Sequence, residues 1–220
     1  MTLRLAWLLA PLALAACTVP VRPAVQTPAP TQLSSEELAA AIAADSRKSE
    51  HETDPQVRAN LAIAARRDAD ACIAAAPQAA ACVFSRAIAL GLEARQHPAL
   101  AGAALNDMLA TLARAEAIDA AYDNAGPARV QALVWIRAPG WPLGPGDPER
   151  GLAAAQRAAS LRPEYPPNWL AVGEAQSKTG AAADARVSYA HARELATAMP
   201  ESTNRTDWLN EAAQALSHLQ

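Results

Sequence analysis

From residue 34 onward, prolines and helix caps divide the chain into a series of alanine-rich segments, each of helical length. Alanine has the highest intrinsic helix propensity, and its small side chain lets neighbouring helices approach closely. The alternation of β-branched residues that is typical of strands is nearly absent. The sequence therefore predicts an all-α domain over residues 34–220, built as a solenoid of stacked antiparallel helical hairpins with about nine helices.

The helix boundaries follow from local signals. Ser34 and Glu37 have the spacing of a capping box. Residues 54–55 and 147–148 each place an aspartate cap before a proline in the first helical turn, and residues 123–127 form a turn whose proline opens the next helix. The expected helices cover residues 34–49, 54–75, 79–95, 100–118, 127–137, 149–161, 167–179, 182–198 and 205–219.

The first residues have the features of a secretory signal that ends at a cysteine. Arg4 precedes an apolar run that is too short to span a bilayer, which needs about 20 residues. Leu14-Ala15-Ala16-Cys17 resembles a bacterial lipobox, in which residues 1–16 are removed and Cys17 carries acyl chains such as palmitate. Thr18, where aspartate would direct retention, favours the outer membrane under the enterobacterial sorting rule. The alternative is an ordinary secretory signal with Cys17 merely beyond it.

Residues 17–33 are expected to be a tether between this anchor and the domain. Four prolines in a nearly uncharged stretch favour extended polyproline II, which at about 3.1 Å per residue reaches roughly 45 Å over residues 18–32. Removal of residues 1–16 takes away one charged residue, Arg4, and changes the formal charge from −3 to −4. This mild acidity, without a Lys/Arg cluster, argues against nucleic acid as a partner.

Near the C-terminus, seven residues have the sizes and spacing of one repeat unit: Trp169, Val172, Gly173, Gly180, Ala185, Tyr189 and Ala192. Residues 166–199 thereby resemble a tetratricopeptide repeat (TPR), in which small residues let paired helices touch, aromatic residues fill the hollows beside them, and a glycine permits the turn. Gln176 departs from the pattern, because that position is usually aromatic, and the terminal proline is displaced to Pro200. A chance helical bundle is the alternative.

A wider resemblance extends over about residues 56–219. The motifs that carry it are Cys72…Pro77…Cys82, Gly91-Leu92, Asp119-Ala120-Ala121-Tyr122, Gly126-Pro127-Ala128-Arg129 and Pro163-Glu164-Tyr165-Pro166-Pro167-Asn168. In these the chain resembles bacterial envelope TPR lipoproteins and is similar to the TRAP-transporter-associated lipoproteins. The resemblance implies helices around a central cavity and association with periplasmic solute-binding proteins.

The two remaining cysteines agree with an envelope location. Cys72 and Cys82 each lie five residues from Pro77, so a helical hairpin that turns at this proline places them opposite each other. The periplasm is oxidising, which favours a disulfide, although two buried thiols at small-residue positions are the alternative. No histidine lies near either cysteine in the sequence, so no metal site is expected.

Residues 138–147 form an irregular loop of prolines, glycines and a tryptophan, Trp141. It can be a rim on the concave face, where Trp135 and Trp141 offer apolar area and Arg129 and Arg137 offer charge; alternatively, Trp141 plugs a gap that an irregular repeat leaves. The complete set of predicted partner-binding residues is Arg129, Trp135, Arg137, Trp141, Leu170, Glu174 and Lys178.

Catalytic and cofactor motifs are missing from the sequence. The four histidines are scattered, and no nucleophile elbow, phosphate loop or dinucleotide fingerprint occurs. The sequence favours a non-enzymatic scaffold that binds a periplasmic or envelope protein. A small apolar ligand combined with a transporter role is the second hypothesis, and an envelope enzyme is the third.

Overall fold

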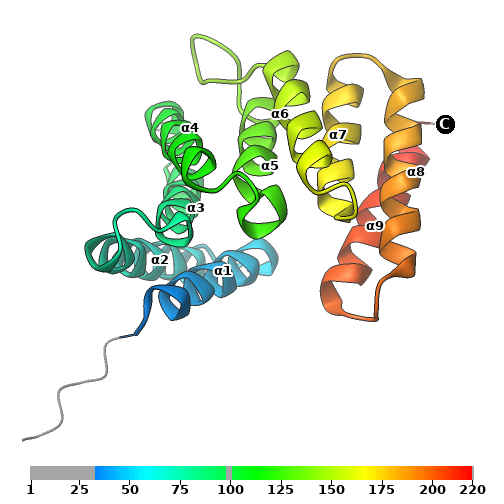
Figure 1. The fold of residues 1–220 in the computed structure, drawn as a ribbon. Coiled ribbons are helices and arrows are strands. Elements are labelled where there is room, and N and C mark those ends of the chain that lie inside the picture. Colours follow the sequence, from blue (N-terminus) through cyan, green and yellow to red (C-terminus); the bar gives the residue numbers. More distant parts are fainter. Residues whose placement is uncertain (1–32, 98–100, 220) are drawn as a thin grey trace, which may run out of the picture. The chain divides into compact units, whose positions relative to one another are not determined.

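The computed structural model describes residues 33–97 and 101–219. In this part of the chain it contains nine α-helices and no named strand, which confirms the predicted all-α class (Figure 1). The helices are α1 Ser35–His51, α2 Pro55–Ala75, α3 Ala80–Gln96, α4 Ala101–Ile118, α5 Tyr122–Arg137, α6 Pro148–Leu161, α7 Pro166–Lys178, α8 Ala182–Ala198 and α9 Thr203–His218. The predicted signal peptide, Cys17 and the tether up to residue 32 lie outside the described residues.

The predicted caps account for where three helices begin. The Ser34 hydroxyl accepts from the Glu37 amide at 3.2 Å, and the Glu37 carboxylate accepts from the Ser34 amide at 2.7 Å, which completes the capping box of α1. Asp54 accepts from the Gln56 amide at 2.8 Å, ahead of the proline that opens α2. Asp147 caps α6 in the same way.

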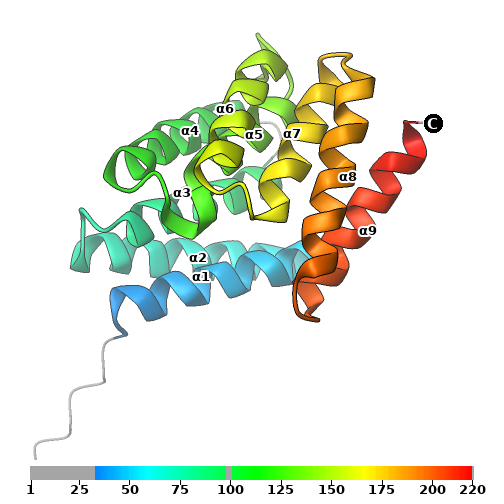
Figure 2. The same ribbon diagram turned by 45° about the vertical axis from the view of Figure 1, so that its right-hand side comes forward.

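The helices form two rows in the described domain (Figures 1 and 2). Each helix packs against the next one along the chain, and α1, α3, α5, α7 and α9 also pack against one another in that order. Within residues 33–97 and 101–219, the even-numbered helices do not pack against one another. The odd-numbered helices are therefore the inner row of a solenoid, and the even-numbered helices are its outer row.

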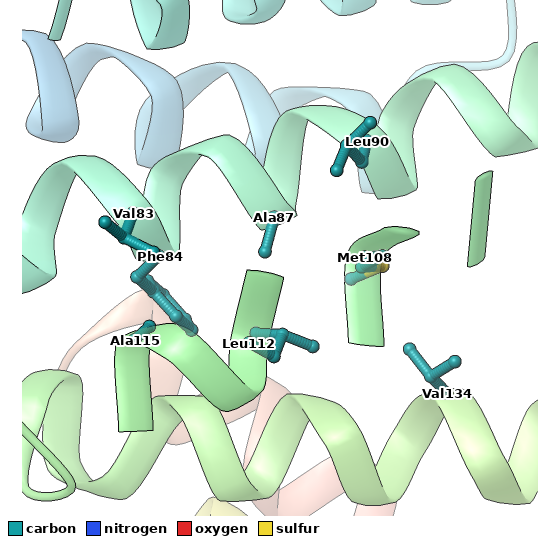
Figure 3. Close-up of a cluster of buried hydrophobic side chains, with 8 residues drawn as sticks. All are labelled: Val83, Phe84, Ala87, Leu90, Met108, Leu112, Ala115 and Val134. Carbon is teal, nitrogen blue, oxygen red and sulfur yellow. The ribbon is translucent and has the colours of Figure 1, made fainter. Parts of the chain in front are cut away.

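A buried cluster joins α3, α4 and α5. Figure 3 shows Phe84 and Ala87 of α3 pointing toward α4, where Leu112 and Ala115 are fully buried. Alanines at this contact let the helices approach closely, and the phenylalanine fills the space that they leave. The ring of Tyr122 meets Phe84 edge-on, with ring centroids 5.5 Å apart.

The α7–α8 hairpin has the contacts that the repeat pattern predicts. A Cβ atom on Gly173 would lie 2.9 Å from the ring of Tyr189, so the close approach of the two helices requires glycine there. Gly180 has a φ of +83° at the turn, a backbone conformation that L side chains rarely adopt. At the position that is usually aromatic, Gln176 instead accepts a hydrogen bond of 2.7 Å from Ser188.

The α2–α3 hairpin carries the predicted disulfide. Cys72 and Cys82 are bonded across the turn that contains Pro77, with their Cα atoms 5.2 Å apart. Both cysteines are fully buried and lie in one cluster with Leu38 of α1. The bond therefore links two helices at the point where α1 packs on them.

Among the described residues, none of the helices combines the length and the apolar character that a membrane span requires.

Candidate functional site

The inner row encloses a groove of about 890 Å³, which we call the inner groove. Its walls include Ile42, Ser46 and Glu50 of α1, Ile88 of α3, Val130, Leu133 and Arg137 of α5, Leu170 and Ala171 of α7, and Asn204, Trp208 and Glu211 of α9. On α1, α5 and α9 these residues recur three or four positions apart and so share one face of each helix. The groove thus follows from the packing of the inner row, with α1 and α9 at its two edges.

The groove wall is about half apolar and half polar. Aliphatic side chains from α1, α3, α5 and α7 line it, together with the aromatic pair of Tyr165, which precedes α7, and Trp208 of α9. In that pair the rings of Tyr165 and Trp208 meet edge-on, with their centroids 5.4 Å apart. A surface of this composition suits the apolar face of a peptide segment or of a small molecule.

An ion pair links α5 to α7 beside the groove. Arg137 Nε donates to Glu174 Oε1 at 2.8 Å, and Arg137 Nη2 donates to Glu174 Oε2 at 2.7 Å. This bidentate geometry gives charge-assisted hydrogen bonds and raises the pKa of Arg137. The structure therefore brings together two of the predicted site residues, but Arg137 is already committed to a carboxylate of its own chain.

A second carboxylate, Glu211 of α9, stands near this ion pair. Desolvation by the surrounding side chains raises the pKa of Glu211; the charge of Arg137 lowers it, and the negative charges of Glu174 and Glu50 raise it. An acid with a raised pKa in the folded protein binds its proton more tightly there than in the unfolded chain, so the protonated acid stabilises the fold at low pH. This stabilisation is lost as the pH rises through the raised pKa. Glu50 and Glu211 line the inner groove, whereas Glu174 lies beside it.

Arg129 touches the groove, but its guanidinium is used within the chain, contrary to its expected role of offering free charge. Its side chain is 11% exposed and forms a 2.9 Å ion pair with Asp123. It donates to the Asn124 carbonyl at 2.9 Å and to the Asn168 side chain at 3.2 Å, and it lies over the ring of Tyr165. Arg129 therefore organises the chain around the α5 N-terminus.

The feature that Arg129 holds is a left-handed turn. Asp123, Asn124 and Ala125 have φ values of 48°, 53° and 62°, so the right-handed part of α5 begins after them, as the predicted turn at 123–127 implies. Left-handed backbone costs roughly 1–2 kcal/mol per residue for L side chains, least for Asn and Asp. Buried Asn168 adds hydrogen bonds from its amide to the carbonyls of Asn124, Ala158 and Arg162.

The structure contradicts the interpretation in which Trp141 of the 138–147 loop plugs a gap. Trp141 is 91% exposed and Leu143 is 76% exposed, so Trp141 plugs no gap in the described domain. The loop does not line the inner groove either. It is compact because its own backbone groups bond to one another, for example Gly146 N to Pro139 O at 2.9 Å, and it rests on α4 at Gly102.

The other predicted site residues are divided between the core and the outside. Leu170 is 4% exposed and contributes both to the groove wall and to the core below it. Trp135 packs against the α5–α6 core, under the guanidinium of Arg150, and Lys178 is exposed; neither lines the groove. The structure therefore does not bring Trp135 and Lys178 together with Arg137 in the inner groove.

Sequence reasoning missed the contributions of α1 and α9. Glu50, Trp208 and Glu211 belong to stripes spaced three or four residues apart on these two helices. The signal was present, since in a solenoid of hairpins every second helix faces the concave side. Applying that rule to the expected helix order would have selected the five inner helices and then these stripes.

Comparison with known proteins identifies the class of fold. Among solved structures, the chain is similar to a thermophilic TPR protein of Thermus thermophilus, with 21% sequence identity and a TM-score of 0.56. The match covers 83% of this chain and 92% of that chain. The chain thus has a TPR-like α-solenoid fold, and at this identity the likeness concerns the fold alone. No protein-family model and no curated protein matches the chain.

Proposed function

We propose that the protein is a periplasmic TPR scaffold, anchored in the outer membrane by lipid at Cys17, and that it binds a segment of an envelope protein in the inner groove. The groove is the observation that carries this proposal. It is lined by all five helices of the inner row, its wall combines apolar side chains with charged groups from α1, α5 and α9, and no side chain of the described residues fills it. TPR-like folds typically serve as protein-binding scaffolds, which supports the same role here.

Two features support the envelope location. The lipobox-like sequence ends at Cys17, next to small residues suited to cleavage. The Cys72–Cys82 disulfide is of the kind that persists in oxidising compartments such as the periplasm.

A second candidate is an accessory lipoprotein that binds a small apolar ligand and docks a periplasmic solute-binding protein of a TRAP-type transporter. The volume of the inner groove, about 890 Å³, favours it, because small-molecule sites usually measure roughly 300–1,000 Å³. The two candidate functions predict different partners, so identifying the bound partner distinguishes between them.

Photocrosslinking in living cells tests the groove. A photoreactive amino acid at Asn204, an exposed groove residue, should give adducts of discrete mass with an envelope protein, identified by mass spectrometry. Asn210 is the matched control, because it is exposed on the same helix but does not line the groove. Capture of a solute-binding protein from Asn204 favours the second candidate. Identical adducts from both positions, or none from Asn204, contradict binding in the groove.

The anchor is tested separately by Cys17→Ser. The variant should lose incorporation of labelled palmitate and leave the membrane fraction, since no acylated cysteine remains to hold it. Thr18→Asp is the control, because it should keep the lipid but shift the protein to the inner membrane under the sorting rule. Wild-type protein that stays soluble and takes up no palmitate contradicts the lipoprotein proposal.

A further inference from the structure

The connection between α5 and α6 projects from the helices and presents apolar side chains to solvent (Figure 1). Trp141 and Leu143 are 91% and 76% exposed, and Pro139 and Pro142 beside them are also exposed. We call these four residues the apolar tip. No charged residue occurs within residues 138–146. Large apolar side chains gathered on a protein surface usually mark a place where another molecule binds.

The apolar tip is held in place by the backbone of its own loop. The amides of Leu143 and Gly144 both donate to the Gly140 carbonyl, at 3.0 Å and 3.2 Å. The loop also rests on α4, where a Cβ atom on Gly102 would lie 2.9 Å from the carbonyl oxygen of Leu143. A segment that is already fixed in one conformation loses little conformational entropy when it binds, so its exposed side chains can make contact at low cost.

The loop offers few backbone donors to a partner. Pro142 and Pro145 have no N–H group, and the amides of Leu143, Gly144 and Gly146 are bonded within the loop. A protein that pairs with backbone would therefore find little to bond here. At the headgroup level of a bilayer few donors are left to be satisfied, and the carbonyl groups of the loop keep their water. Tryptophan is enriched at that level, because its ring is apolar and its indole N–H is polar. These features favour a lipid surface.

We propose that Trp141 and Leu143 insert at the headgroup level of the membrane that carries the anchor, so that the domain touches lipid through the 138–147 loop. This inference rests on the proposed anchor at Cys17. Residues 18–32 reach roughly 45 Å, and a compact domain of this length is about 40 Å across, so the loop can reach the bilayer. Two inserted side chains bind lipid weakly, but a tether supplies an effective concentration on the order of millimolar.

Titration of a labelled loop with vesicles tests the inference. The protein is the mature chain from residue 17 with Cys17→Ser, which carries no lipid of its own. Leu143→Cys in this chain carries nitrobenzoxadiazole, a fluorophore that brightens in apolar surroundings. Cys72 and Cys82 are bonded to each other, so the label has a single target. With vesicles of phosphatidylethanolamine and phosphatidylglycerol, the emission should rise and shift to shorter wavelength, and doxyl-labelled lipid should quench it.

Two other positions provide matched controls. Ile63→Cys on α2 and Val187→Cys on α8 replace apolar residues that are 68% and 70% exposed, and labels there should not respond to vesicles. In the protein labelled at Leu143, Trp141→Ser should raise the lipid concentration at half-maximal response about tenfold, since it removes apolar area that inserts. Trp141→Phe should keep this concentration within about threefold. Because Trp141 is exposed, both variants should melt at the wild-type temperature.

Other outcomes overturn the inference. A label at Leu143 that ignores vesicles, that responds no more than the two control labels, or that responds equally in Trp141→Ser would show that the tip does not insert. In living cells, a photoreactive amino acid at Leu143 that gives one discrete protein adduct and no lipid adduct would assign the loop to a protein partner instead. The vesicle assay uses protein without lipid, so its failure is distinct from that of the proposed function, which shows as missing palmitate at Cys17 or missing crosslinks from Asn204.

Discussion

Asn168→Ala should destabilise the protein by about 3–5 kcal/mol, because it removes donors from several buried carbonyl groups and an acceptor from Arg129. Asn168 is fully buried, and its amide reaches the carbonyls of Asn124, Ala158 and Arg162 at 3.0–3.2 Å. The same hydrogen bonds hold the left-handed turn in its strained backbone conformation. Without them, nothing compensates for that strain. Urea unfolding followed by far-UV circular dichroism measures the loss.

Asn106→Ala is the matched control for this prediction. Asn106 makes one side-chain bond, to the Gly102 carbonyl within α4 at 3.0 Å, and is exposed. Its replacement should change the free energy of unfolding by less than about 0.5 kcal/mol, as is usual for surface positions. A loss for Asn168→Ala no larger than this would show that Asn168 does not hold the turn.

Removing the disulfide should cost about 2–4 kcal/mol, because an eleven-residue loop is no longer closed in the unfolded chain. The variant Cys72→Ala/Cys82→Ala avoids a free thiol, and its urea midpoint should fall accordingly. Non-reducing peptide mapping of protein taken from the cell envelope should find one linked peptide that contains both cysteines.

Reduction provides the control. Wild-type protein in dithiothreitol should unfold near the midpoint of the double variant, and dithiothreitol should not change the double variant itself. Quantitative labelling of Cys72 and Cys82 in non-reduced protein would show that the bond is absent from the native chain.

Local signals predicted the helices and the hairpins well. The caps at Ser34, Asp54 and Asp147 act within a few residues, so sequence alone locates the helix starts that they determine. The disulfide was also predictable, because its cysteines lie on either side of one short turn. Gly173 and Gly180 were informative for the same reason, since their roles concern one hairpin.

Long-range pairing explains what the sequence did not reveal. Arg137 meets Glu174 from 37 positions away, and Arg129 meets Asn168 from 39 positions away, so nothing local indicated that either arginine was already used. Trp141 was misjudged because an isolated aromatic residue in a Pro/Gly loop gives no sign of whether a partner surface lies nearby. Its exposure depends on the path of the loop, which backbone hydrogen bonds between glycines and prolines determine.

The last helix has a consequence for how a partner enters the groove. In α9 only Ala212 is fully enclosed, whereas α3 has nine buried residues, and among the described helices α9 packs on α7 and α8 alone. In a linear array of repeats, the cost of detaching an end unit is that of its single interface. Transient release of α9 would widen the groove at the Glu211 side while the disulfide-linked end keeps its shape. Partner capture would then be a gated event whose rate is set by the stability of one terminal helix.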